Sequence, residues 1–278
     1  MQQKPNPFIP YMSTIKSVAD LTSDVKLFNV ELDDPTVSDG FNYHPGQFAF
    51  LSAYGIGEAP FCLTSAAHRK AGIEFAIRAV GTVTNALHEL EEGAKVGIRG
   101  PFGNSFPMED YKGKDIIIIG GGIGMAPLHP VINTIVDHRA DYGNLLIING
   151  ARSPQDLVFA DEFDVWAKAS KANVELTVDR GDDDWKGRVA LIPDVVVDLN
   201  PSPKNTMAII CGPPIMIHFT LIKLKDLGFA NDQIVTTLEN KMKCGLGKCG
   251  RCNIGDKYIC VDGPVFTFEQ ISHFIEQF

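Results

Sequence analysis

Four cysteines towards the C-terminal end of the chain have a spacing that could hold a metal centre. Cys244, Cys249, Cys252 and Cys260 follow the pattern C-x4-C-x2-C-x7-C. Zinc sites usually combine two C-x2–4-C pairs, whereas C-x4-C-x2-C begins the loop of a plant-type [2Fe–2S] cluster. Three grouped cysteines followed by a fourth therefore favour a [2Fe–2S] cluster. Structural zinc and free thiols are the alternatives.

The segment that carries these cysteines is rich in glycine and in positive charge. Gly245, Gly247 and Gly250 would let the backbone wrap tightly and turn its N–H groups towards a cluster. Lys243, Lys248 and Arg251 would favour the reduced, more negative form of a cluster, unless they only form a solvated rim. The composition of the segment thus agrees with a redox role for the cysteines.

A glycine-rich turn, GGGIGMAP, occupies residues Gly120–Pro127, directly after an apolar run and before a helix-like stretch. Backbone N–H groups and a helix N-terminus in such a turn favour an anion such as a phosphate. The dinucleotide fingerprint G-x-G-x-x-G is not matched, because Met125 and Pro127 stand where the last glycine would fall. The turn predicts a phosphate site, with a simple tight turn as the alternative.

The composition narrows the class of protein. Apolar residues make up 45% and charged residues 21%, as in a folded globular chain rather than a disordered or fibrous one. With 25 Lys and Arg against 34 Asp and Glu, the net charge of −9 disfavours binding to nucleic acid or to an anionic membrane. No apolar stretch approaches the ~18 residues of a membrane span, and no signal-peptide core is present. We therefore expect a soluble, cytoplasmic protein, in which patterned cysteines bind metal rather than form disulfides.

Three different sequence patterns along the chain predict three domains. Residues 1–108 carry short runs rich in β-branched and aromatic residues between turns, which is typical of a barrel or sandwich. The expected strands are Val25–Leu32, Gln47–Ser52, Ile73–Val80 and Lys95–Arg99.

Residues 109–235 alternate apolar runs with helix-like stretches, which predicts a doubly wound α/β domain. The expected buried strands are 115–119, 144–148, 174–178 and 207–211, and the expected helices are Met125–Arg139, Gln155–Ser170 and Pro214–Leu227.

Residues 236–278 form the cysteine-rich module and one last helix. Thr267 and Gln270 have the spacing of a capping box, and Phe266 and Ile271 that of a hydrophobic staple. We expect the apolar face of this helix to pack on the core of the chain itself, with partner binding as the alternative. That face consists of Ile271, Phe274, Ile275 and Phe278.

Taken together, these motifs resemble the ferredoxin–NADP reductase superfamily over nearly the whole chain. Gly120–Pro127 matches its GGGxGxxP motif, and Cys211–Met216 matches its CGPPxM motif. Its flavin-barrel signatures are matched by His44–Phe48, Arg78–Leu87 and Gly100–Gly103. The resemblance implies an N-terminal antiparallel flavin-binding β-barrel, a doubly wound parallel α/β nucleotide-binding domain and a small C-terminal [2Fe–2S] module.

The segment LENKMKCG at Leu238–Gly245 is similar to one branch of this superfamily. That branch contains the flavin-bearing electron-transfer subunits of soluble NiFe hydrogenases, anaerobic sulfite reductases, heterodisulfide reductase and dihydroorotate dehydrogenase. The resemblance implies a diaphorase-type, NAD(P)H-dependent subunit with FAD and a [2Fe–2S] cluster, which exchanges electrons with such a partner. An independent reductase that serves a carrier such as ferredoxin, or a zinc-containing binding module, is the alternative.

One flavin motif of the superfamily, Arg-x-Tyr-Ser, is altered here to Ala59-Pro60-Phe61-Cys62. The arginine that would pair with the flavin phosphate is absent, and Arg78 is the obvious substitute. Phe61 replaces the stacking tyrosine. Cys62 replaces the serine near flavin N5, where it could affect flavin reactivity or only be a small buried residue.

The resemblance also implies the site residues. Flavin contacts fall on Phe61, Cys62, Leu63, Thr64, Arg78, Gly81, Val83, Thr84, Gly100 and Gly103. Contacts with the nicotinamide nucleotide fall on Gly120, Gly121, Gly122, Gly124, Met125, Arg152, Arg180, Cys211, Gly212 and Met216. Cys62 and Cys211 are the residues expected beside the reacting rings. The choice between NAD and NADP stays open, because Arg152 or Arg180 could contact a 2′-phosphate or only a ribose. Hydride transfer needs positioning rather than an acid–base dyad.

Overall fold

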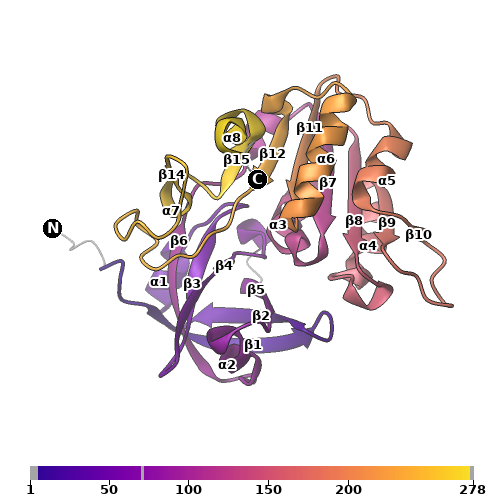
Figure 1. Ribbon diagram of the computed structural model, residues 1–278. Coiled ribbons are helices and arrows are strands. Elements are labelled where there is room, and N and C mark those ends of the chain that lie inside the picture. Colours follow the sequence, from indigo (N-terminus) through magenta and orange to yellow (C-terminus); the bar gives the residue numbers. More distant parts are fainter. Residues whose placement is uncertain (1–5, 70–71, 276–278) are drawn as a thin grey trace. The chain divides into compact units, whose positions relative to one another are not determined.

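The computed structural model describes residues 6–69 and 72–275, and these form two compact units (Figure 1). The first unit falls in the ranges Met1–Asp20, Asp24–Ser105 and Glu239–Pro264. The second falls in the ranges Leu21–Ser23, Phe106–Leu238 and Val265–Phe278. No helix in the described residues is long and apolar enough to cross a membrane.

The first unit is built on a six-stranded antiparallel sheet with the strand order β4-β3-β6-β1-β2-β5. Its edge strands β4 and β5 contact one another, which makes the sheet barrel-like. The strands are β1 (Tyr11–Asp20), β2 (Val25–Leu32), β3 (Phe48–Ala53), β4 (Gly57–Cys62), β5 (Ile73–Arg78) and β6 (Lys95–Phe102), and the helices are α1 (Pro35–Gly40) and α2 (Thr82–His88). The core inside the barrel includes the fully buried side chains of Ile15, Phe28, Phe75 and Ile98.

The barrel confirms the predicted antiparallel class, and β2 has the predicted bounds. Strands β1 and β4 were not predicted. Most side chains of β1 are exposed or only partly buried, so its apolar alternation is weak. Strand β4 contains Pro60, which a central strand would not tolerate but an edge strand does.

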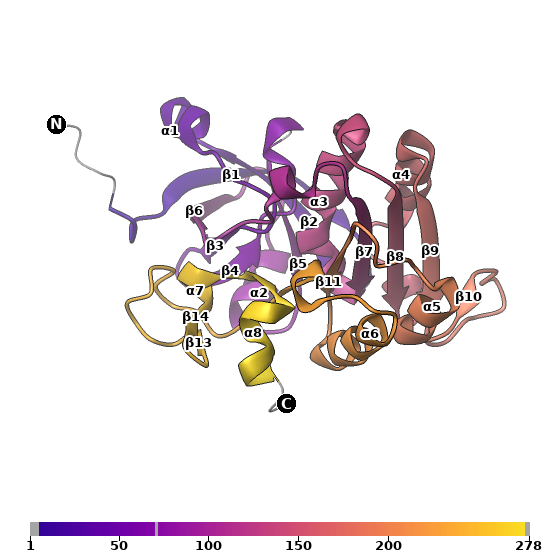
Figure 2. The same ribbon diagram turned by 90° about the horizontal axis from the view of Figure 1, so that it is seen from above.

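The second unit contains a seven-stranded sheet with the order β10-β9-β8-β7-β11-β12-β15. Strands β7 to β12 pair in parallel, and β15 pairs antiparallel with β12. Helices α3 and α4 cover one face of this sheet and α5 and α6 the other (Figure 2). The strands are β7 (Asp115–Gly121), β8 (Leu145–Ala151), β9 (Asn173–Val178), β10 (Arg188–Val189), β11 (Thr206–Cys211), β12 (Ile234–Thr237) and β15 (Val265–Thr267), and the helices are α3 (Met125–Asp137), α4 (Phe163–Ser170), α5 (Ile192–Leu199) and α6 (Pro214–Asp226).

This unit confirms the predicted doubly wound α/β class, with differences in detail. Before α4, where a helix was expected from residue 155, the chain forms two short 3-10 turns at Pro154–Asp156 and Ala160–Glu162. Phe159 has a left-handed backbone with φ of 58°, which a continuous helix cannot contain. Helix α5 and the short strands β10, β12 and β15 were not predicted.

The C-terminal residues are shared between the two units. Residues 239–264, with β13 (Asn253–Ile254), β14 (Lys257–Tyr258) and α7 (Ile259–Asp262), belong to the first unit. Strand β15 and helix α8 (Phe268–Ile275) belong to the second, whereas residues 236–278 were predicted to form one module. The difference arises because β15 pairs with β12, a pairing that leaves no local pattern in the sequence.

The predicted start of the last helix is confirmed. The backbone N–H of Thr267 donates to Gln270 Oε1 over 2.9 Å, and the N–H of Gln270 donates to Thr267 Oγ1 over 3.4 Å. Ile271 is fully buried, as expected for a face that packs on the core of the chain. The side chains of Phe274 and Ile275, and Phe278 altogether, lie outside the residues that the structure describes.

Candidate redox cofactor sites

The cysteine loop in the first unit turns backbone N–H groups towards its first cysteine. The N–H groups of Leu246 and Lys248 each donate to Cys244 Sγ over 3.3 Å. Burial raises the pKa of the Cys244 thiol, but these hydrogen bonds and that from the N–H of Cys249 outweigh burial and bring the pKa to about 6. The loop therefore stabilises negative charge on this sulfur, as a thiolate ligand requires.

The remaining cysteines complete the group. Cys252 Sγ and Cys260 Sγ lie 3.3 Å apart, and the N–H of Gly247 donates to Cys260 Sγ over 3.2 Å. Cys252 and Cys260 are buried, Cys249 is exposed, and each is a free thiol. No three ligating side chains in the described ranges are compact enough to hold a single metal ion. Thiols from one loop, with backbone amides directed at them, have the donor chemistry that an iron–sulfur cluster needs.

Glycine is required at the point where this loop meets the barrel. Gly245 has a φ of 75°, and a Cβ atom there would come within 3.0 Å of the rings of Phe50 and Phe102. A second contact follows at Gly103, where a Cβ atom would lie 2.7 Å from the carbonyl oxygen of Gly263. The cysteine loop is thus packed directly on strands β3 and β6 and on the segment after β6.

The predicted flavin residues at the end of β4 are buried to different degrees. Leu63 and Thr64 lie inside the barrel, and Thr64 Oγ1 accepts a hydrogen bond from the N–H of Ala76 over 3.2 Å. A flavin contact at these two positions would therefore come from the main chain. Phe61 packs edge-on against Phe75. Burial raises the pKa of the Cys62 thiol to about 11, so this thiol is neutral near pH 7 and is not an activated nucleophile.

Arg78, the candidate for the flavin phosphates, ends strand β5. Its Nε forms an ion pair with Asp24 Oδ2 over 3.1 Å, and its side chain is partly exposed. The contact of this guanidinium with the flavin phosphates stays a prediction.

The other predicted flavin residues follow Arg78 and β6. Thr84 Oγ1 accepts hydrogen bonds from the N–H groups of Val80 and Gly81 over 2.9 and 2.8 Å, so this hydroxyl caps α2. Val83 packs against the barrel core. Gly100 has a φ of 152°, and a Cβ atom there would lie 2.9 Å from Ala49 Cβ. These residues shape the backbone, and their contacts with a flavin stay a prediction.

In the second unit, the glycine-rich turn and the CGPPIM segment meet at the carboxyl ends of adjacent parallel strands. Strand β7 pairs with β11, and Gly120 is in register with Cys211. The chain leaves β7 towards β8 and β9 and returns at β11, so the strand order reverses between β7 and β11. Ligands of doubly wound sheets bind at such a switch point.

Small residues allow the two segments to approach closely. A Cβ atom on Gly124 would overlap the carbonyl group of Cys211, and one on Gly121 would lie 2.7 Å from Met216 Sδ. Met125 follows as the first residue of α3. The glycines predicted to surround the nucleotide are therefore brought together with Cys211, Gly212 and Met216.

Two polar residues that were not predicted as site residues lie in this region. Asn149 is in register with Gly120 at the end of β8, and both polar atoms of its buried side chain lack a hydrogen-bond partner. Thr237 Oγ1 donates to Cys211 Sγ over 2.9 Å. Asn149 ends an apolar run, the position where a polar residue indicates a ligand. Thr237 has no comparable signal. Orphaned polar atoms beside the glycine turn fit a polar ligand such as a nucleotide.

Arg152 and Arg180 follow β8 and β9 at the same edge of the sheet. Arg152 is exposed and pairs with Asp156 at 3.3 Å, and the backbone N–H of Arg180 donates to the carbonyl of Arg152 over 3.0 Å. Both side chains lie on the surface, so their contact with a nucleotide stays a prediction.

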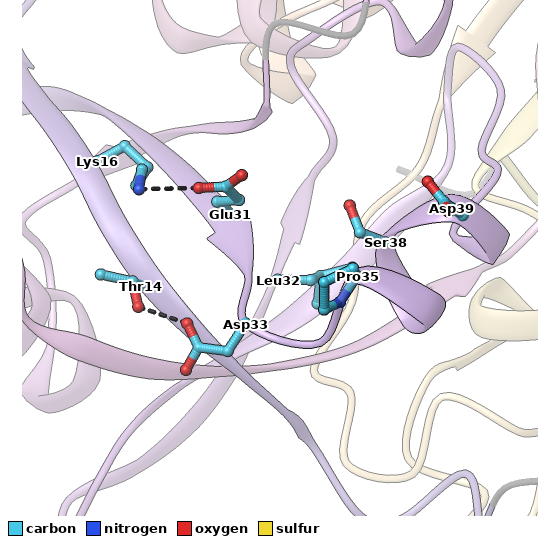
Figure 3. A pocket seen from close by; sticks show the side chains of 8 residues that line it. All are labelled: Thr14, Lys16, Glu31, Leu32, Asp33, Pro35, Ser38 and Asp39. Atoms are coloured by element: carbon cyan, nitrogen blue, oxygen red, sulfur yellow. Dashed lines mark hydrogen bonds and ion pairs between the residues drawn. The ribbon is translucent and has the colours of Figure 1, made fainter.

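A surface pocket on the barrel contains none of the predicted site residues (Figure 3). Lys16 Nζ lies 2.8 Å from Glu31 Oε2, and Thr14 Oγ1 donates to Asp33 Oδ1. Because these charges already have partners within the pocket, we assign it no cofactor.

Domains of known protein families match segments in both units. An oxidoreductase FAD-binding domain matches residues 13–106, an oxidoreductase NAD-binding domain matches residues 118–221, and the iron–sulfur cluster binding domain of dihydroorotate dehydrogenase B matches residues 239–272. A solved chain of NADH-dependent reduced ferredoxin-NADP oxidoreductase has a TM-score of 0.76 at 24% identity, with 100% of this chain and 95% of that chain covered. A ferredoxin NADP+ reductase from Neisseria gonorrhoeae has a TM-score of 0.68 at 20% identity, with 81% and 96% covered.

Two relatives define the family more closely. Sulfhydrogenase 1 subunit gamma of Pyrococcus furiosus is 39% identical, with 98% of this chain and 95% of the relative covered. The probable dihydroorotate dehydrogenase B (NAD(+)) electron transfer subunit of Methanocaldococcus jannaschii is 33% identical, with 97% and 93% covered.

The three matched domains define an oxidoreductase with FAD-binding, NAD-binding and iron–sulfur domains. The chain belongs to the family of electron-transfer subunits that contains the sulfhydrogenase gamma and dihydroorotate dehydrogenase B subunits. The predicted family, fold class and cofactor domains are thereby confirmed.

Proposed function

We propose that this chain passes electrons between NAD(P)H, FAD and a [2Fe–2S] cluster, to or from a partner oxidoreductase. The observation that carries the proposal is the packing of the cysteine loop on the flavin-type barrel within one compact unit. A nicotinamide exchanges a hydride, an iron–sulfur cluster exchanges single electrons, and a flavin does both. The protein supplies positions and charges for these groups.

The [2Fe–2S] type of cluster rests on the C-x4-C-x2-C start of the loop. Cys244, Cys249, Cys252 and Cys260 would hold it. The N–H groups directed at Cys244 and Cys260 would lower the cost of adding an electron. The cytoplasm is the proposed compartment, because its reducing conditions keep such thiols free for ligation.

In the second unit, the glycine turn would hold the nucleotide pyrophosphate through backbone N–H groups at the start of α3. Cys211, held by the Thr237 hydroxyl, would lie beside the nicotinamide. Asn149 would use its free amide group on the same ligand. The choice between NADH and NADPH depends on the surface residues Arg152 and Arg180.

The proposed partner is the catalytic subunit of a larger redox enzyme. Both relatives are named as subunits, and a hydrogenase or a dihydroorotate dehydrogenase is the partner type that their names suggest. A sulfite reductase or a heterodisulfide reductase-type enzyme would need the same supply of single electrons. The second candidate function is an independent reductase for a soluble carrier such as ferredoxin, in line with the fold shared with ferredoxin NADP+ reductase.

Anaerobic titration tests the proposal as a whole. Stepwise addition of NADH, and separately of NADPH, to purified protein should bleach the flavin bands and then reduce the cluster absorption. The nucleotide that acts at lower concentration is the physiological one. A protein that contains zinc and no flavin or iron would contradict the proposal. Full turnover with ferredoxin, in a preparation free of other chains, would favour the independent reductase.

The role of Arg78 can be tested separately. Arg78→Ala should weaken flavin binding by about ten- to a hundredfold, because an ionic hydrogen bond to a phosphate is lost. Fluorescence of the flavin released on dilution measures this affinity. Asp24→Asn is the matched control, since it removes the ion-pair partner of Arg78 and leaves the guanidinium in place. Equal flavin affinity in Arg78→Ala and wild type would show that another group neutralises the phosphates.

A further inference from the structure

Arg99 is a buried charge in the first unit. It lies in strand β6, and only 3% of its surface is exposed. A charged side chain is almost never buried to this degree unless it is paired. Its guanidinium makes a two-pronged ion pair with Glu58 of β4, in which Nε donates to Oε2 over 3.0 Å and Nη2 to Oε1 over 2.7 Å.

The remaining donors of Arg99 reach backbone carbonyl groups, and two of these belong to the cysteine loop. Nη1 donates to the carbonyl of Cys244 over 3.1 Å, and Nη2 to that of Lys243 over 3.3 Å. Nη1 also donates to the carbonyl of Pro7 over 3.1 Å. A guanidinium has five N–H donors in a planar fork, so the whole donor capacity of Arg99 is used.

Two aromatic rings lie close to the guanidinium. Arg99 Cζ lies 4.4 Å from the centre of the Phe50 ring and 5.4 Å from that of Phe102. The same two rings are those that a Cβ atom on Gly245 would meet at 3.0 Å. Arg99 and the residue after Cys244 are therefore held by one aromatic pair, and the five-donor fork cannot be reproduced by an ammonium group.

We propose that Arg99 is the positioning residue of the cluster loop. It holds the main chain of the first cluster ligand, Cys244, on the barrel, and its positive charge favours the reduced cluster. Because Gly100 and the rest of the predicted flavin segment follow Arg99 directly, the residue joins the two cofactor-binding segments of this unit. This inference rests on the proposed cluster, since its electrostatic part requires one.

The first experiment compares Arg99→Met, Arg99→Lys and wild type in holoprotein reconstituted with iron and sulfide. Arg99→Met should lose iron to a chelator about tenfold faster, because ionic hydrogen bonds to the loop are removed. Arg99→Lys should restore the midpoint potential but only part of the chelator resistance, because it keeps the charge and loses the fork. Lys95→Met is the control, since Lys95 pairs with Asp33 on an exposed part of the same strand and sheet.

The midpoint potential provides a readout that a purely structural role would not move. Loss of the positive charge in Arg99→Met should shift the cluster potential to more negative values. Glu58→Gln removes the opposite charge and should shift the potential to more positive values. Shifts of the same sign, or no shift in either variant, would overturn the electrostatic part of the inference.

Hydrogen exchange on the apoprotein separates this inference from the proposed function. Amides at residues 244–248 should exchange about tenfold faster in Arg99→Met than in Lys95→Met, without any cluster bound. If wild type binds no iron and sulfide, the proposed function fails, while this measurement still decides the positioning role. If wild type binds a cluster and Arg99→Met matches it in chelator resistance and exchange, Arg99 has no positioning role and the proposed function stands.

Discussion

A Cys249→Ser variant should lose the visible spectrum of the cluster while the flavin stays bound. Cys249 is the exposed member of the four cysteines, so serine there leaves no cavity in the core and no buried polar group. A serine hydroxyl is a far poorer ligand than a thiolate, and loss of one of four ligands opens the cluster to solvent. We expect bound iron and sulfide to fall by at least about tenfold.

Metal analysis, visible absorption and the paramagnetic resonance signal of the reduced protein measure this loss. Cys62→Ser is the matched control, because Cys62 also lies in the first unit but outside the loop. That control should keep the iron content of wild type. Iron retained in full by Cys249→Ser would contradict the assignment of this ligand, and zinc in place of iron in wild type would contradict the type of centre.

The second large effect is expected at Gly122, in the turn between β7 and α3. A Gly122→Asp variant should raise the KM for the nicotinamide nucleotide by at least about tenfold, because a carboxylate faces a pyrophosphate of the same charge. Gly122 has a φ of 54°, a left-handed backbone that favours glycine. Asn and Asp are the side chains that tolerate this conformation best, so the fold should survive.

Gly122→Asn is the control that isolates the charge. It has the same size and the same backbone requirement as Gly122→Asp, but it carries no charge. Steady-state reduction of a dye by NADH or NADPH measures both variants, and their flavin and iron contents should equal those of wild type. If both variants raise the KM equally, the effect is steric. If neither does, the phosphates lie elsewhere.

The sequence was most informative where a pattern of residues serves a single structural or chemical purpose. The order of cysteines, the glycine turn and the CGPPIM segment led to the family and the cofactor classes, because few other patterns serve those purposes. The capping box of Thr267 and Gln270 was also readable, since it is a local exchange of hydrogen bonds. Buried parallel strands such as β7 and β11 are continuous apolar runs and were predicted at nearly their observed bounds.

Interactions between distant segments could not be predicted. Arg99 looked like the last residue of a strand, and its five hydrogen bonds reach three separate parts of the chain. Thr237 has no signal in the sequence and became visible only when the sheet placed it beside Cys211. Asn149 ends an apolar run, but only the register of β7 with β8 places it beside Gly120. Pairing of this kind is set by the tertiary fold, and a single sequence carries no direct record of it.

The pairing of β12 with β15 has a consequence for how such a chain can be assembled in evolution. Thr237 is in register with Val265, so the segment from Leu238 to Pro264 leaves and re-enters the parallel sheet at neighbouring positions. The cluster module is therefore an insertion between the two strands of a hairpin. Holding the two ends of this insertion at neighbouring positions costs little conformational entropy. A gene could therefore gain, lose or exchange this module by a single event, with the nucleotide-binding sheet and its last helix kept intact.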